Sequence, residues 1–508
     1  MKCAPKWLPR ICRLHSGTHS WPKVDMKCLS ASKADKSVAR MMKLQATRHL
    51  QPNPNFALIA AALLIVVVGL FGGSSRHDAV QNLALRPLVA LFLIPALYFA
   101  GGEAMRRGRS LLIILGLLGV WMAVQLVPLP PSFWQSLPMR ESIAEMDQLV
   151  GLQGTWRPIS LAPSRGWNAL FSLIVPIVAL LLVLSMRLKG RTLLILIAGL
   201  AAIDAVFGLL QVSLSGDRLL YLYKITNSGS PVGLFANENH SAIFSVLGLL
   251  VLARLGLTSA AFKEPPWARL LYSFAYVLLV LVALVSGSRA GLVAALLALC
   301  ATAAMAWFAR QGSASRPNRI GTVTQSNLPT PTARTLLIVF VALSGAVLAA
   351  FFFLEGSPGL TSFVGQNAME DLRWKIWPIL QEMISVFWLL GTGFGSFNEV
   401  YYTFEPTELL SPSYVNQAHN DWAQYLIEGG VPAAALFAAF VVWMRKSALC
   451  LLSSSKPLFI MCFWLPIFII IVAASVVDYP LRTPIFQLVF VWLLLALDED
   501  GESQRPSS

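Results

Sequence analysis

Long apolar runs separated by shorter polar stretches dominate the pattern of this sequence. Many of these runs approach the roughly 20 residues that an α-helix needs to cross a bilayer. They lack the strict alternation of apolar and polar residues that a membrane β-strand shows. Because backbone groups in lipid must form their hydrogen bonds within the segment, we predict an all-α fold, a polytopic membrane helical bundle.

The runs predict about twelve transmembrane helices, with bounds good to about four residues. Their ranges are 56–71, 83–100, 111–129, 168–186, 192–213, 237–254, 268–286, 291–309, 334–354, 420–444, 457–477 and 482–497. The first nine therefore fall within residues 56–354, and the last three fall within residues 420–497.

The polar stretches outside these helices differ in size and character. Residues 355–419 form the largest loop, in which the stretch 371–391 has the spacing of an amphipathic helix lying on a membrane surface. Residues 1–55 are basic and without periodicity, and we expect a disordered cytoplasmic segment there. Residues 498–508 are expected to form a cytoplasmic tail.

Composition and charge agree with a membrane protein. Of the 508 residues, 56% are hydrophobic and 13% are charged, whereas soluble domains are about 25% charged. The net charge of +14 would fit a nucleic-acid partner, but the basic residues gather in every second short loop. That is the positive-inside pattern, so we expect no nucleic-acid partner, membrane lipids as neighbours, and both termini in the cytoplasm.

This orientation places His419 on the outer side, at the start of a predicted helix. Asn420 and Asp421 follow it and can cap that helix. The positive end of a helix dipole favours a neutral imidazole, which can accept a proton as a general base must. Position alone favours the simpler interpretation, an interfacial histidine hydrogen-bonded to loop backbone.

Arg289 lies in SGSRAG (286–291), a tight turn on the outer side at the start of the next helix. An arginine there opposes the positive-inside trend, and a guanidinium can bind a phosphate with two hydrogen bonds. The other basic residues placed outside are Arg218, Lys224, Arg373, Lys375 and Arg482. Together they indicate a membrane-borne polyanion such as a lipid diphosphate, although each alone fits a contact with solvent or a lipid headgroup.

Two further polar groups lie at or in the predicted spans. GLFANENHSA (233–242) brings Asn237, Asn239 and His240 to the mouth of a span, where amides either bind sugar hydroxyls or cap the helix. Asp204 lies mid-membrane, where an ionisable residue is a functional candidate. It can equally be a hydrogen-bonded packing residue.

Other motifs carry weaker signals. GTGFGSF (391–397) lacks the preceding strand and following helix of a dinucleotide site, so flexible turns are the better interpretation. Trp134, Trp156 and Trp167 suit a membrane interface. No cluster of Asp, His and Cys has the spacing of metal ligands, so we predict no metal site.

Taken in order, GLFANENHSA, SGSRAG, RWKIWPIL…GTGFGSF and AHNDWAQYLIEGGVP resemble the O-antigen ligase and O-antigen polymerase-like family. PLPPSFW and DYPLRTP look similar to that family as well. The resemblance covers about residues 56–497. It implies a glycosyltransferase of the bacterial inner membrane that takes a glycan from undecaprenyl diphosphate at the periplasmic face, in lipopolysaccharide or exopolysaccharide biosynthesis.

The resemblance also implies roles for single residues. His419 matches the histidine proposed to activate the acceptor hydroxyl, and Arg289 matches an arginine proposed to hold the diphosphate. We therefore predict these two as catalytic. Substrate-binding residues are predicted to be Arg373, Arg218, Lys224, Asn237, Asn239, His240, Asn420 and Arg482.

The acceptor implied by the family is lipid A-core, a growing glycan or a protein, and the family needs no metal or other cofactor. The basic N-terminal extension is not typical of it. The loop 355–419 is modest in size for a ligase, so ligase and polymerase both remain open. Direct displacement at the anomeric carbon would invert its configuration.

Two other function classes remain open. A secondary transporter has a similar number of spans, but it would place polar residues and broken helices at mid-membrane. Here Asp204 is nearly alone at that depth. A non-catalytic assembly component for polysaccharide export would make the polar residues of the outer face individually dispensable.

Overall fold

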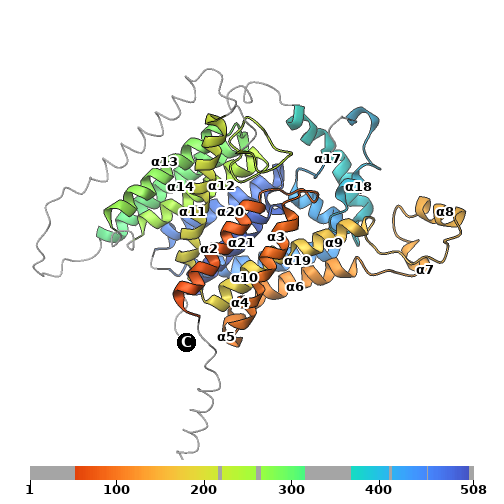
Figure 1. Cartoon of the computed structure of the whole chain (residues 1–508), viewed down its shortest axis with the longest axis horizontal. Coiled ribbons are helices and arrows are strands. Elements are labelled where there is room, and N and C mark those ends of the chain that lie inside the picture. Colours follow the sequence, from red (N-terminus) through yellow and green to blue (C-terminus); the bar gives the residue numbers. More distant parts are fainter. Residues whose placement is uncertain are drawn as a thin grey trace, which may run out of the picture. The chain divides into compact units, whose positions relative to one another are not determined.

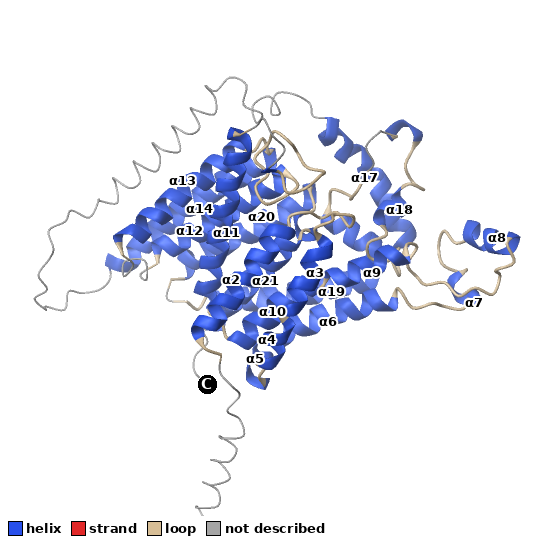
Figure 2. Cartoon of the chain, in the orientation of Figure 1, coloured by secondary structure: helices blue, strands red, loops and turns tan. Residues whose placement is uncertain are grey.

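The computed structural model describes residues 52–214, 220–258, 265–314, 368–410, 415–454 and 456–502. Within these ranges the regular elements are helices, and no strand is present (Figures 1 and 2). The prediction of an all-α fold is confirmed for this part of the chain.

The helices are labelled in chain order in Figure 1. Those up to Ser213 are α2 (Pro54–Phe71), α3 (Asn82–Leu91), α4 (Leu93–Tyr98), α5 (Gly102–Arg107), α6 (Arg109–Val124), α7 (Pro131–Trp134), α8 (Glu141–Leu149), α9 (Pro163–Ser172), α10 (Ile174–Met186) and α11 (Gly190–Ser213). Those that follow are α12 (Glu238–Leu257), α13 (Pro266–Val285), α14 (Arg289–Ala314), α17 (Ala368–Phe387), α18 (Phe397–Tyr401), the 3-10 helix η3 (Thr407–Leu409), α19 (Asp421–Leu451), α20 (Pro457–Val477), the 3-10 helix η4 (Pro480–Arg482) and α21 (Pro484–Glu502).

Seven of the described helices are long and apolar enough to cross a membrane. They are Pro54–Phe71, Pro163–Met186, Gly190–Ser213, Glu238–Leu257, Arg289–Ala309, Asp421–Leu451 and Pro457–Val477. Shorter apolar helices are Asn82–Tyr98, Arg109–Val124 and Leu270–Val285. The predicted span 334–354 lies outside the described residues, and the total of twelve stays a prediction.

α12 is the most deeply buried of these helices. In its most apolar 18-residue window, 83% of the residues are buried inside the protein. It packs against α11, α13, α14 and α20. A helix that is apolar on all sides is expected to be enclosed by other helices, and α12 follows that rule. Both ends of α12 carry polar side chains, which are described below.

Asp204 of α11 is hydrogen-bonded inside the bundle. Its Oδ1 accepts from the Leu234 amide at 2.6 Å, and its Oδ2 accepts from the Ser241 hydroxyl at 2.9 Å. Gly233 has a φ of 58°, and a Cβ there would lie 2.1 Å from Asp204 Oδ1. Of the two interpretations of Asp204, the contacts favour the packing residue.

Gln211, two turns further along α11, reinforces this attachment. It accepts the Gly233 amide at 2.8 Å and donates to the Gly233 carbonyl at 2.9 Å. Both side chains therefore hold the backbone around residue 233 against α11, just ahead of α12.

The expectation that Trp134 lies at a membrane interface is wrong. Its side chain is fully buried, and its indole nitrogen donates to the Thr155 carbonyl at 3.0 Å. The Arg157 guanidinium lies 5.8 Å from the ring centroid. Trp134 is thus buried within the segment that contains α7 and α8. Trp156 and Trp167 are exposed, and their location at a membrane interface stays a prediction.

The predicted amphipathic helix 371–391 corresponds to α17, which begins earlier and ends at Phe387. Its apolar face, with Ile376, Leu380 and Met383, belongs to a buried cluster that includes residues of α18 and α19. Trp374 is exposed. One face of the helix therefore packs on protein, and its location on a membrane surface stays a prediction.

Candidate functional site

Two glycine-containing segments, GTGFGSF (391–397) and the EGG of α19 (428–430), lie in direct backbone contact. The Thr392 amide donates to the Ile427 carbonyl at 2.9 Å, and the Gly393 amide donates to the Glu428 carbonyl at 3.0 Å. A Cβ on Gly391, whose φ is 73°, would lie 2.2 Å from the Glu428 carbonyl oxygen. The loop of GTGFGSF is therefore not merely a set of flexible turns, because its backbone is in close contact with α19.

α19 changes direction within this contact. Gly430 has a non-helical φ of 60° and ψ of −157°, a conformation that favours glycine. The Gln125 amide of the segment after α6 donates to the carbonyls of Leu390 and Glu428, each at 2.9 Å. The short segment from Asp421 to Gly429 is thereby fixed against two other parts of the chain.

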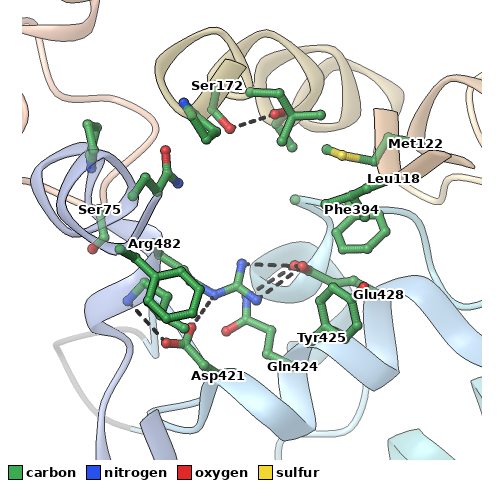
Figure 3. Close-up of a pocket in the computed structure, with 18 of the residues that line it drawn as sticks. Ser75, Leu118, Met122, Ser172, Phe394, Asp421, Gln424, Tyr425, Glu428 and Arg482 are labelled. Atoms are coloured by element: carbon green, nitrogen blue, oxygen red, sulfur yellow. Dashed lines mark hydrogen bonds and ion pairs between the residues drawn. The ribbon is translucent and has the colours of Figure 1, made fainter. Parts of the chain in front are cut away.

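Arg482 joins two buried carboxylates from this short segment. Its Nε donates to Asp421 Oδ1 at 3.1 Å, and both terminal nitrogens lie 3.3 Å from Glu428 Oε2. Figure 3 shows the guanidinium held between the two acids. Glu428 also accepts from the Gln424 amide at 3.0 Å. Substrate binding by Arg482 stays a prediction, and any such ligand must share this arginine with two carboxylates.

His419 precedes this segment in an unusual backbone conformation. Its φ is 49°, in the left-handed region that costs an L-residue roughly 1–2 kcal/mol. Such outliers persist where surrounding structure enforces them, and they cluster at functional sites. Asn420 is the N-cap of α19, and its side chain accepts the Ala423 amide at 3.0 Å. Its predicted substrate contact stays a prediction.

Asp478, between α20 and η4, faces both candidate histidines. Its Oδ1 lies 3.6 Å from His419 Nδ1 and 3.8 Å from His240 Nε2. Its Oδ2 accepts from the side-chain amides of Asn239 at 3.1 Å and Asn237 at 3.4 Å. Four residues predicted as site residues thus converge on one buried carboxylate, here called the Asp478 cluster.

Arg289 begins α14 next to the Asp478 cluster. Ala290, the residue after it, lines a small cavity together with His240, Asp478 and Asn239. The N-terminus of a long helix favours anions through its free amides. The helix start that carries Arg289 and the two histidines are therefore neighbours around one carboxylate.

Tyr479 fixes the two imidazoles from the side. Its ring centroid lies 5.0 Å from that of His419 and 5.3 Å from that of His240, in edge-to-face arrangements. Such geometry is the favoured one for aromatic pairs. The ring therefore restricts the orientation of both histidines toward Asp478.

The remaining predicted residues are not brought into this cluster by the described structure. Lys224 is exposed. Arg218 lies outside the described residues, and Arg373 belongs to α17 with a side chain that also lies outside the described part. Within the described ranges, no group of three or more His, Cys, Asp or Glu residues could hold a metal ion.

Sequence reasoning missed Asp478. The motif DYPLRTP was recognised for its arginine, while its acid was passed over. The available signal was that this acid lies at the predicted outer end of a span and directly precedes the tyrosine of that motif. The missing information was its proximity to two histidines that lie far away in the sequence.

Residues 274–438 match the family model described as O-antigen ligase. This match confirms the resemblance to the O-antigen ligase- and polymerase-like family. The family is one of glycosyltransferase-like enzymes, and with the apolar helices it indicates a membrane protein. No curated protein matches the sequence.

The O-antigen ligase match includes Arg289, His419 and Glu428 but not His240 or Asp478. The Asp478 cluster thus joins residues inside the matched stretch to residues on either side of it. The fold brings both sets to the same place, since α14, α12 and α20 pack together.

Proposed function

We propose that this O-antigen ligase-like protein transfers a glycan from undecaprenyl diphosphate to an acceptor hydroxyl at the periplasmic face of the bacterial inner membrane. One observation carries the proposal. Asp478 Oδ1 faces the Nδ1 atom of His419 at 3.6 Å, beside the helix start that bears Arg289. The family match supports the reaction class.

His419 acts as the general base in this proposal. Its Nε2 accepts the acceptor's hydroxyl proton while the oxygen attacks the anomeric carbon. The Asp478 carboxylate faces the other ring nitrogen, so it orients the imidazole and stabilises the imidazolium that forms. The bond from the anomeric carbon to the diphosphate oxygen breaks, and its electron pair leaves with the diphosphate. This displacement inverts the anomeric configuration and uses no cofactor.

Arg289 stabilises the negative charge that grows on the departing diphosphate. It begins α14, so the free amides of that helix add to its attraction for an anion. Charge stabilisation matters most where charge develops in the transition state, and losing one such group typically costs on the order of 10²–10³ in rate. Arg373 and Arg218 are proposed to assist.

Asn237 and Asn239 act as positioning residues. Their amides bind Asp478 Oδ2, while Oδ1 accepts from the Tyr479 amide at 3.0 Å and faces the histidines. His240 is buried against the same carboxylate. These contacts favour an indirect role for Asn237 and Asn239 over direct binding of sugar hydroxyls.

The test uses a deletion strain complemented with wild type, His419→Asn or Arg289→Gln. Asparagine tolerates the left-handed conformation of residue 419 better than most residues, so this change removes the imidazole with little backbone penalty. We expect a loss of about 10²–10⁴-fold in glycan transfer at normal protein level. Full activity of both variants would contradict the proposal.

The same strain distinguishes the acceptors. Core lipid without long glycan, together with accumulated lipid-linked polymer, identifies a ligase. Single repeat units on the core identify a polymerase. Unchanged lipopolysaccharide directs the search to a protein or exopolysaccharide acceptor, whose modification must then depend on His419.

A further inference from the structure

A pocket of about 440 Å³ lies beside Arg482, and it shares no lining residue with the small cavity at Asp478. Asp421, Glu428 and Arg482 line it, whereas His419 and Asp478 do not. Its volume is within the roughly 300–1,000 Å³ typical of ligand sites. Figure 3 shows the ion pairs of Arg482 on one side of this pocket and Ser172, Leu118 and Met122 on another.

One part of the pocket wall is apolar along the length of several helices. α6 contributes Leu111, Leu115, Leu118 and Met122, whose spacing of three and four residues places them on one helix face. α10, α19 and α21 complete this wall with apolar side chains such as Leu180 and Phe440. These side chains therefore form an apolar groove, here called the apolar lane, that is suited to a hydrocarbon chain.

The other part of the pocket wall is polar. Arg165, Asn168 and Ser172 share one face of α9, and Asn82 and Arg86 share one face of α3. A pocket with a polar part and an apolar lane fits an amphiphile better than a sugar or a purely apolar ligand.

Most of the arginines in the pocket are already neutralised. Arg76 pairs with Asp78 at 3.0 Å, Arg165 pairs with Glu399 at 2.5 Å, and Arg482 pairs with two carboxylates. Arg86 is different, because the described residues offer it no carboxylate within 4.0 Å and no hydrogen-bond acceptor.

His77 adds no positive charge to this wall at neutral pH. Burial lowers the pKa of its imidazole, and the charge of Arg165 lowers it further. Arg86 is therefore the cation of the pocket whose charge remains available for a ligand. A half-buried arginine in an apolar helix is costly unless an anion accompanies it.

We propose that this pocket binds a phosphorylated lipid, with the phosphate at Arg86 and a hydrocarbon chain along the α6 face. It is a second lipid site, separate from the one assigned to the diphosphate at Arg289. A guanidinium binds a phosphate with two parallel hydrogen bonds, and the apolar lane supplies the burial that the chain requires. Asp421 and Arg482 line this site, whereas His419 does not.

The test measures lipid binding by the purified full chain in nanodiscs of zwitterionic phosphatidylcholine, using native mass spectrometry. The added probes are undecaprenyl phosphate, phosphatidylglycerol and inorganic phosphate. Arg86→Gln is expected to weaken binding of a phosphorylated lipid about 10- to 100-fold, the value of a charge-assisted hydrogen bond. Arg86→Lys is expected to recover part of it.

A matched pair tests the apolar lane. Leu118→Trp fills the pocket and is expected to reduce lipid binding, while Leu117→Trp, on the exposed face of the same helix, is expected to leave it unchanged. Preference for undecaprenyl phosphate identifies a prenyl chain, and preference for phosphatidylglycerol identifies a diacyl lipid. Either preference supports the site.

Wild-type binding by both Arg86→Gln and Leu118→Trp would overturn the proposal. Equal competition by inorganic phosphate would also overturn it, because the lane would then contribute nothing. Binding is measured without transfer, and the readout is the difference between wild type and the two pocket variants. Failure of this lipid site is therefore distinguishable from failure of the proposed chemistry at His419.

Discussion

The two ends of α12 carry similar kinds of side chains in two different arrangements. One end has His240 beside Asp478, and the other has Arg254 beside Asp500. His240 and Arg254 are 14 positions apart (254 − 240), which corresponds to about 21 Å along a helix. Each end thus joins one cationic or titratable side chain of α12 to an acid: the buried Asp478 after α20, or the partly buried Asp500 of α21.

The Asp500 end is closed by short contacts. Arg254 Nη2 lies 2.5 Å from Asp500 Oδ2, which also accepts from the Trp464 indole at 2.9 Å. The guanidinium lies 4.7 Å from the Phe463 ring centroid. A second acid at this end of α21 contacts α19, because Asp498 accepts from the Ser447 hydroxyl at 3.1 Å. These contacts fasten four helices together.

The Asp478 end is different, because the histidine contacts of 3.6 and 3.8 Å exceed hydrogen-bonding distance. Catalytic contacts are often long and tighten only when the reacting groups are bound. The backbone of His419 is also strained, whereas Arg254 lies within a regular helix. The comparison teaches that the Asp500 end stabilises the packing of the helices, whereas the looser Asp478 end fits the chemistry proposed for His419.

Arg254→Ala tests the cohesive end and is expected to have the largest effect on stability. It leaves Asp500, whose side chain is only 26% exposed, without its cation, so we expect a loss of about 3 kcal/mol, the lower end of the cost of breaking a buried ion pair. Thermal unfolding in detergent measures the loss. Glycan transfer per folded molecule is expected to remain, and a stable Arg254→Ala protein without transfer would reverse the roles of the two ends.

Gly391→Ala tests the close backbone contact between GTGFGSF and Glu428 of α19. The new Cβ would lie 2.2 Å from a carbonyl oxygen at a positive φ, so we expect a loss of about 1–3 kcal/mol. The control is Gly116→Ala in α6, where a Cβ meets nothing within 4 Å. That change is expected to be neutral or stabilising by up to about 1 kcal/mol. Equal stability of the two variants would refute this contact.

Asp204→Asn separates mid-bundle packing from function. Asparagine can still accept from the Leu234 amide, but its NH2 group then faces the Ser241 hydroxyl, whose proton loses its acceptor. An unmatched buried polar group costs about 1–3 kcal/mol. Unfolding measures this loss. Abolished transfer in a folded Asp204→Asn protein would instead assign chemistry or ion movement to Asp204.

Asn420→Ala is expected to have the smallest effect on stability, about 1 kcal/mol for a lost helix cap. Asn420→Ser retains a capping oxygen and should recover most of that stability. If Asn420 only caps α19, serine also restores transfer. Transfer that stays low in Asn420→Ser would show that the amide binds substrate, as the sequence predicts.

Much of the helical fold could be predicted from the sequence, because apolar runs report on helices directly. The apolar face of α17 was recognisable from its spacing in the same way. Trp134 was assigned wrongly, because an aromatic residue next to a span looks interfacial whether it faces lipid or the core of a loop. Burial of such a residue depends on partners such as Thr155, which the local pattern does not reveal.

The site was less accessible from sequence. His419 and Arg289 were found through motifs, but Asp478 gains its meaning only from residues 59 and 238 positions earlier (478 − 419 and 478 − 240). The glycines of GTGFGSF indicated turns, while the close approach to Glu428 that they permit is a tertiary contact. Arg86 could not be recognised as a binding residue from the sequence. What distinguishes it is that no carboxylate among the described residues lies close to it, and that is a tertiary property.

The central claim is that Asp478 serves the chemistry of His419. Its most direct test is single-turnover glycan transfer from undecaprenyl diphosphate by purified Asp478→Asn, beside wild type. This change keeps the size of the side chain and removes its negative charge. The account predicts a rate about 10²–10⁴-fold lower in a protein that still folds, with a loss of stability of about 1–3 kcal/mol for the acceptor that becomes a donor. Transfer at the wild-type rate by the folded variant would contradict it.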